Sequence, residues 1–235
     1  MMRHISLAFL FAVSSVFFLS GCADDADRKL EEIRFLLDDG KYDQALELAQ
    51  GLVEDHPDNL KAQFYLAEAN LASGGLSGGN PNCEDGDVGM LGLLACLQDD
   101  NAGGESNMST FRRIAPATEA KLAQVQTATD LLVELSSTEL ESKNLYLLLF
   151  LSRLFEISGP IVTLGAIEPG SCSNGNTLSS TEEARFDENL DTIESDGKKA
   201  GLPEDFSLFT RIGEIQQEIE DAASLSDFFQ DNLCS

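Results

Sequence analysis

The sequence predicts an all-α protein, and three observations favour that fold class. Apolar residues recur three and four positions apart in most segments, which places them on one face of a helix. Two segments are preceded by a Thr or Ser with a Glu three positions later, the pattern of an N-terminal capping box. Strand signals are nearly absent, and only residues 161–167 could form an extended segment. We therefore expect a single all-helical domain over residues 22–235.

The first 21 residues are typical of a signal peptide. Arg3 gives a basic start, and residues 5–19 contain twelve apolar residues and three serines. This stretch of fifteen residues is shorter than the ~20 that a membrane-spanning helix needs. It therefore indicates export instead of a transmembrane anchor.

The end of this apolar stretch, Leu19-Ser20-Gly21-Cys22, resembles the bacterial lipobox. The resemblance implies cleavage before Cys22, which would carry a diacylglyceryl thioether and an acylated amine. Several acyl chains hold a protein stably on a membrane. By resemblance to enterobacterial sorting, Ala23 implies the outer membrane, on the periplasmic face of a Gram-negative envelope. The inner membrane, and an ordinary signal peptide with an incidental cysteine, remain the alternatives.

The composition excludes several classes of function. The chain has 41 acidic and 15 basic residues, and its formal net charge is -26. This charge argues against binding nucleic acid or anionic lipid surfaces, because both rely on Lys and Arg. One of the two histidines lies in the signal peptide, which leaves little room for His-based catalysis. We expect no cofactor and no metal site, and a basic protein partner, divalent cations or a saline habitat are each compatible with the charge.

The first part of the mature chain, residues 24–74, predicts helical hairpins. Helices are expected over residues 24–38, 42–55 and 59–72, with Asp58 as the N-cap of the third. Glycine permits the tight turn after the first helix, and a proline ends the second.

Four residues of these hairpins resemble the tetratricopeptide repeat. Gly40 fits the turn glycine, Tyr42 the aromatic that follows it, Ala45 the small residue where two helices touch, and Pro57 the closing proline. The resemblance spans residues 26–74 and implies antiparallel helical hairpins. One and a half repeats cannot bury a continuous core, so further helices are required.

The resemblance to the repeat is weakest at its start. Lys29 stands where the family usually has a bulky residue, and Glu32 stands at the usual leucine.

A glycine-rich loop is expected over residues 74–106, which contain nine glycines. Residues 75–79 match the Gly-x-Ser-x-Gly pattern of hydrolases, but that pattern needs a preceding strand and here a helix precedes it. Residues 82–87 carry oxygen ligands without EF-hand spacing, so a loose Ca²⁺ site is only an alternative to a solvated turn. Because no nucleophile–base pair is visible, we expect no enzyme activity.

The last part, residues 107–235, predicts helices without a recognisable consensus. One is expected from Pro116 to about residue 135, and an apolar one up to Ser158 after a capping box at 138–141. Another follows a box at 180–183, and a long one opens at Pro203. Short turns are expected over residues 107–114 and 226–232. The apolar stretch 145–167 contains Arg153, which favours a buried helix over a membrane span.

Four cysteines remain after Cys22, and an even number in an exported chain predicts disulfides. They permit three pairings, of which we expect Cys83–Cys96 and Cys172–Cys234. Zinc binding is disfavoured because no Cys-x-x-Cys pair exists.

The leading functional hypothesis is a lipid-anchored scaffold that binds a protein partner in a groove between helices. Lys61, Phe64 and Asn70 are the candidate groove residues. The alternative is a ligand-binding lipoprotein, similar to the tetratricopeptide-like component associated with some TRAP transporters. In that case Arg153 would bind an organic acid in a cavity, whereas the simpler expectation is an ion pair between Arg153 and Glu156.

Overall fold

The computed structural model describes residues 25–76, 111–112, 114–140, 142–166 and 177–233, and within them it contains helices and no strands. The all-α prediction is therefore confirmed. The elements are α2 (Asp25–Asp38), α3 (Tyr42–Asp55), α4 (Leu60–Leu71), the π-helical turn η1 (Ala72–Leu76), α7 (Glu119–Leu135), α8 (Lys143–Ile157), α9 (Gly159–Thr163), α10 (Ser180–Ala200), α11 (Ser207–Asp221) and α12 (Leu225–Leu233).

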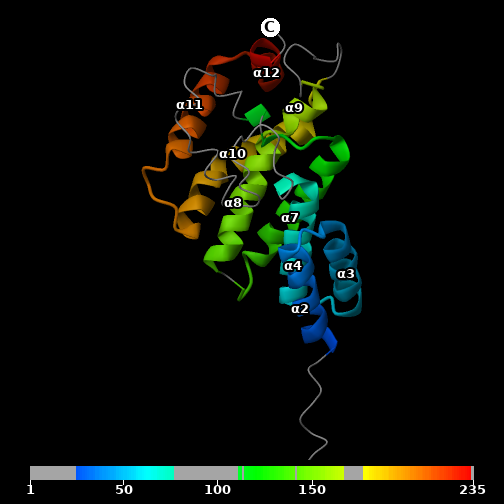
Figure 1. Ribbon diagram of the computed structural model, residues 1–235. Coiled ribbons are helices and arrows are strands. Elements are labelled where there is room, and N and C mark those ends of the chain that lie inside the picture. Colours follow the sequence, from blue (N-terminus) through cyan, green and yellow to red (C-terminus); the bar gives the residue numbers. More distant parts are fainter. Residues whose placement is uncertain (1–24, 77–110, 113, 141, 167–176, 234–235) are drawn as a thin grey trace, which may run out of the picture.

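Successive long helices pack side by side from α2 through α3, α4, α7 and α8 to α10. Figure 1 shows this order, with the α2–α3 hairpin at one end of the molecule and α12 at the other. Helices α2 and α4 also contact each other, as do α4 and α8, whereas α3, α7 and α10 approach one another less closely. The stack therefore curves, and α2, α4 and α8 lie on its concave side.

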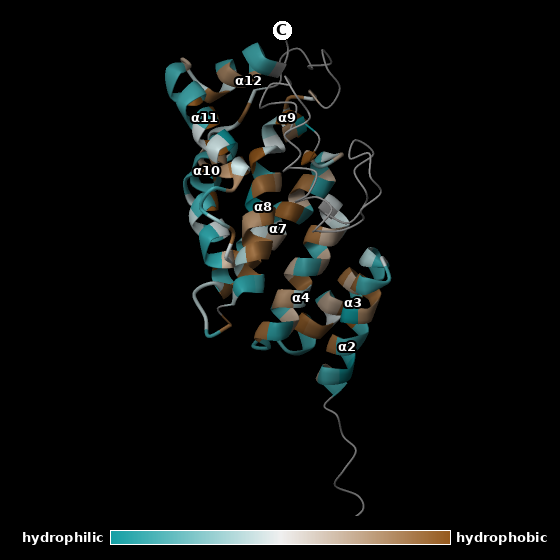
Figure 2. Cartoon of the chain, turned by 60° about the vertical axis from the view of Figure 1, so that its left-hand side comes forward, coloured by the Kyte–Doolittle hydropathy of each residue, from teal (hydrophilic) through white to brown (hydrophobic). Residues whose placement is uncertain are grey.

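Two hydrophobic clusters hold the stack together. The smaller lies between α2, α3 and one side of α4, and includes Ile33, Ala45 and Leu52, all fully buried. The larger surrounds α8 and receives side chains from α4, α7, α10, α11 and α12. Figure 2 shows hydrophobic residues concentrated along α8, with polar residues frequent on α10 and α11. Because α4 contributes to both clusters, it connects the repeat-like hairpin to the rest of the molecule.

Helix α8 is a core helix. The stretch Lys143–Thr163 is long and apolar enough to cross a membrane by length and composition alone. However, 94% of its apolar window is buried inside the protein. This burial is what the charged residues within the stretch led us to expect.

The structure corrects the predicted N-capping residue of two helices. Asn59, not Asp58, caps α4, and its Oδ1 accepts hydrogen bonds from the amides of Lys61 and Ala62 at 3.1 Å each. Ser179, not Ser180, forms the capping box of α10 with Glu182. A capping residue must have an extended backbone directly before the helix, and neighbouring polar residues in sequence cannot be told apart on that criterion.

The predicted box at residues 138–141 is also corrected. Ser142 caps α8 by accepting a hydrogen bond from the amide of Leu145 at 3.2 Å. Thr138 instead lies in the turn that follows α7, where its hydroxyl donates to the carbonyl of Leu135 at 2.7 Å.

Several boundaries in the last part of the chain also differ from expectation. Part of the segment expected to be extended is the short helix α9, with Pro160 in its first turn. Helices α7 and α11 begin at Glu119 and Ser207, three and four residues after the prolines expected to open them. The C-terminal turns expected at 226–232 form one helix, α12.

Candidate functional site

The residues that resemble the tetratricopeptide repeat shape the α2–α3–α4 unit. Gly40 has a φ of +73°, a conformation that favours glycine, and it turns the chain from α2 into α3. Tyr42 is the first residue of α3, and Ala45 is fully buried in the smaller cluster. The carbonyl of Pro57 accepts a hydrogen bond from Nε2 of Gln63 at 2.6 Å in the turn before α4. These residues determine the geometry of the hairpin.

Only part of the concave side is open. From Leu145 to Ile157, every residue of α8 except Leu147 is buried. The start of α11 contributes to this, because the ring of Phe150 meets those of Phe206 and Phe209 edge-on at 6.3 and 6.1 Å. The accessible concave surface is therefore made by α2 and α4.

We define the α2–α4 face by Arg34 and Asp38 of α2 and by Lys61 and Glu68 of α4. Lys61 and Glu68 are two turns apart and so lie on one side of α4. Burial raises the pKa of Glu68 to about 6, with a further increase from the Asp38 carboxylate and an opposing effect of the Arg34 guanidinium. The face thus carries two cations and two carboxyl groups, and one of the carboxyl groups, Glu68, has a pKa of about 6.

The three predicted groove residues have different environments. Lys61 is exposed on the α2–α4 face. Phe64 is half-buried, packs against the larger cluster and meets the ring of Tyr65 edge-on at 5.9 Å. Asn70 is buried, and its amide donates to the carbonyl of Leu66 at 2.9 Å, so it does not contribute to the accessible surface of α4. Glu68 was missed, although its spacing from Lys61 placed it on the same side of the helix.

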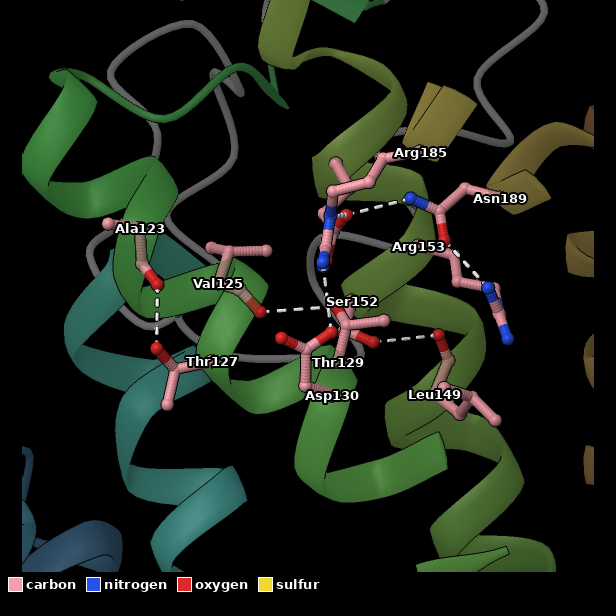
Figure 3. A network of polar contacts seen from close by, with 11 residues as sticks. Ala123, Val125, Thr127, Thr129, Asp130, Leu149, Ser152, Arg153, Arg185 and Asn189 are labelled. Atoms are coloured by element: carbon pink, nitrogen blue, oxygen red, sulfur yellow. Dashed lines mark hydrogen bonds and ion pairs between the residues drawn. The ribbon is translucent and has the colours of Figure 1, made fainter. Parts of the chain in front are cut away.

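Arg153 is buried between α8 and α10 and binds protein groups. Its Nε donates to Oδ2 of Asp196 at 2.8 Å, and its Nη1 donates to Oδ1 of Asn189 at 2.6 Å. Figure 3 shows Arg153, Asn189 and Arg185 converging from the two helices. Because Asp196 neutralises the guanidinium, Arg153 is not available as the expected site for an organic acid.

Glu156 has its own partners on α10, so the expected ion pair between Arg153 and Glu156 is wrong. Arg185 binds the Glu156 carboxylate through two nitrogens, at 3.1 and 2.9 Å, and also lies 3.0 Å from Oδ1 of Asp130 on α7. The Asn189 amide donates to Glu156 at 2.8 Å and so links both charged residues of α8. A cavity beside Glu156 and Arg185 measures only about 20 Å³, which has room for about one water.

Several predicted residues lie outside the described part of the chain. These are Cys22, Cys83, Cys96, Cys172, Cys234 and the loose Ca²⁺ candidate at residues 82–87. Among the residues that the structure describes, no group of His, Cys, Asp and Glu side chains could hold a metal ion.

Comparison with known proteins gives one match. A family model for the tetratricopeptide repeat matches residues 36–77, which include α3, α4 and η1. No curated protein and no solved structure matches the chain. The match confirms the repeat-like character of the first helices, and it supports a role in protein–protein interaction in general terms. The helices after residue 77 pack in the same alternating manner without a recognisable repeat sequence.

Proposed function

We propose that this protein is a lipid-anchored periplasmic scaffold, held on the outer membrane, that binds a protein partner through the α2–α4 face. The observation that carries the proposal is the repeat match at residues 36–77, which includes α4, one of the two helices that form the accessible part of the concave side. Stacked helical repeats bind extended segments or helices on such surfaces.

The charges of the α2–α4 face indicate the chemistry of the partner. Arg34 and Lys61 offer donors, while Asp38 and Glu68 offer acceptors, so a polar segment of mixed charge is the complementary ligand. Such charged groups contribute more to specificity and association rate than to affinity.

The anchor rests on the lipobox-like Leu19-Ser20-Gly21-Cys22 sequence. Helix α2 begins at Asp25, three residues after Cys22, so the chain between them spans at most about 10 Å. If Cys22 is acylated, the α2–α3 hairpin lies next to the bilayer, and a partner would meet the protein close to the membrane.

Site-specific photo-crosslinking in the native envelope tests partner binding. A photoreactive residue replaces Arg34 or Lys61 on the α2–α4 face, and exposed Asp191 or Lys198 on α10 serves as the matched control. We expect one protein to crosslink from both positions of the face and from neither control. Equal crosslinking from all four positions, or none from the face, would contradict the proposal.

Metabolic labelling with a clickable fatty acid tests the anchor. The wild-type protein should incorporate the label and fractionate with outer membranes, whereas Cys22→Ser should lose the label. Labelling that persists in Cys22→Ser, or an unlabelled wild-type protein, would exclude acylation at Cys22. The crosslinking result stands independently of this outcome.

A further inference from the structure

A second feature of the molecule is a cavity at the end of the repeat-like hairpin. It measures about 450 Å³, within the range of small-ligand sites. Three segments form its walls: the turn into α3 with the first turn of that helix, the π-helical turn η1, and the first turn of α7. The lining residues are Gly40, Lys41, Tyr42, Asp43, Gln44, Ala72, Ser73, Gly75 and Lys121.

Hydrogen bonds hold these three segments together. Ser73 of η1 donates through its hydroxyl to Oδ1 of Asp43 in α3 at 2.9 Å. Lys121 of α7 donates to the carbonyl of Ser73 and lies 3.3 Å from its hydroxyl. Ser73 is itself buried and contacts both neighbours, so it joins the three walls of the cavity.

The charge of the cavity is opposite to that of the molecule. The whole chain has a net charge of -26, but the cavity is lined by two ammonium groups, Lys41 and Lys121, against one carboxylate, Asp43. The pair between Lys41 and Asp39, at 2.6 Å, joins two half-exposed side chains and is therefore weak. An ammonium has three donors, so Lys41 retains others for a ligand.

The amides at the start of α3 add to this positive character. Lys41 occupies the N-cap position, and its side chain makes no capping hydrogen bond. Tyr42, Asp43 and Gln44, whose amides have no partner within the helix, are themselves lining residues.

We propose that this cavity binds a small oxyanion, as a carboxylate or phosphate group, between Lys41 and Lys121. The Asp43 carboxylate is engaged by Ser73, so the anion would lie toward the two ammonium groups and the Tyr42 ring. No residue of α2, α4 or α8 lines the cavity, so this site is separate from the α2–α4 face. It could be occupied whether or not the scaffold proposal holds.

Titration of the full ¹⁵N-labelled protein with inorganic phosphate, and separately with succinate, tests the proposal. We expect saturable NMR shifts of the Tyr42, Asp43 and Gln44 amides with at least one of the two anions. Saturation with phosphate alone or succinate alone would identify the class of ligand. The absence of saturable shifts with both anions would overturn the proposal.

Matched lysine variants show whether the two ammonium groups are responsible. Lys41→Gln and Lys121→Gln should each weaken binding roughly tenfold or more, because each removes a charged donor. Lys198→Gln makes the same charge change at an exposed position of α10 that does not line the cavity, and it should leave affinity within twofold. Equal weakening in all three variants would indicate a general charge effect and would refute the site. Since Lys41 is half-exposed, its variant is informative even if Lys121→Gln is unstable.

Discussion

Arg153 and Glu156 are charged residues on the most apolar helix of the chain, and each is neutralised from another helix. The side chain of Arg153 is only 7% exposed and that of Glu156 only 2%. Removing one partner of a buried ion pair strongly lowers the stability of the protein. Replacing both partners by apolar residues of similar volume changes the stability little. Their role is therefore to fix how α8 and α10 pack, because both side chains bind groups of the protein itself.

The first prediction concerns Asp196. Asp196→Ala leaves the Arg153 guanidinium buried without its carboxylate, and we expect the free energy of unfolding to fall by about 3 kcal/mol. Urea denaturation followed by circular dichroism measures this. Asp191→Ala, on the exposed side of the same helix, should change stability by less than about 0.5 kcal/mol. The double variant Arg153→Met/Asp196→Leu should recover much of the loss; if it does not, packing and not the unpaired charge is the cause.

The second prediction concerns the pH dependence caused by Glu68. Its pKa is about 6 in the folded protein and near its ordinary value of 4.5 in the unfolded chain. The folded state therefore holds this proton more tightly, so the contribution of Glu68 to stability is greatest below pH 4.5 and is lost as the pH rises through about 6. Above that pH the loss amounts to about 2 kcal/mol.

Glu68→Gln removes this titration. The variant should be more stable than wild type at pH 8, with a flatter profile between pH 4.5 and 6, in urea denaturation at each pH. Glu47→Gln, at an exposed position of α3, is the matched control and should keep the wild-type profile. A Glu68→Gln profile that parallels that of wild type would show that other groups cause the dependence.

At the scale of elements, local sequence determines that a helix exists but not where it starts. In α10 two adjacent serines, Ser179 and Ser180, both precede acidic residues at suitable spacings. The structure selects Ser179, whose hydroxyl accepts from the Glu182 amide at 3.3 Å while Glu182 accepts from the Ser179 amide at 2.7 Å. Ser180 is then the first residue of the helix, where a serine side chain has no capping role.

The third prediction separates these two serines. Ser179→Ala should lower the free energy of unfolding by about 1 kcal/mol, because it leaves the Glu182 amide in the first turn of α10 without its acceptor. Ser180→Ala should be neutral or slightly stabilising, because alanine favours the helix interior. Thermal unfolding by circular dichroism distinguishes them, and a larger effect at Ser180 would show that the helix starts one residue later in solution.

At the scale of the whole molecule, the two hydrophobic clusters differ in size, so α2 is packed less extensively than α8. Helix α2 is covered on one side only, by a small cluster in which alanines are frequent. Helix α8 is surrounded by the larger cluster, which is rich in Leu and Phe. Regions with few buried contacts open locally at lower free energy than the core.

The fourth prediction follows from this inequality. In hydrogen exchange with mass spectrometry, α8 should exchange most slowly and α2 much faster. Ile33→Ala, which removes a fully buried side chain from the smaller cluster, should accelerate exchange in α2 and α3 more than in α8. Leu149→Ala in the larger cluster should accelerate exchange throughout. If Ile33→Ala affects all helices equally, the chain unfolds as one unit.

Local periodicity by itself determined the fold class, the first three helices and the repeat-like turn. Gly40 and Pro57 act within a few residues of themselves, so their effect can be recognised without knowing the rest of the structure. The apolar character of α8, interrupted by Arg153, likewise predicted a buried helix and not a membrane span.

Only the tertiary structure decided which side chains are available for binding. The partners of Arg153 and Glu156 lie on α10, more than 25 residues away in sequence, so no local pattern could assign them. The same holds for the concave side, which closes at α8 because α11 packs against it, and for the cavity that Lys41 and Lys121 both line. Every helix has several faces, and only the faces that neighbouring helices leave uncovered are available for binding.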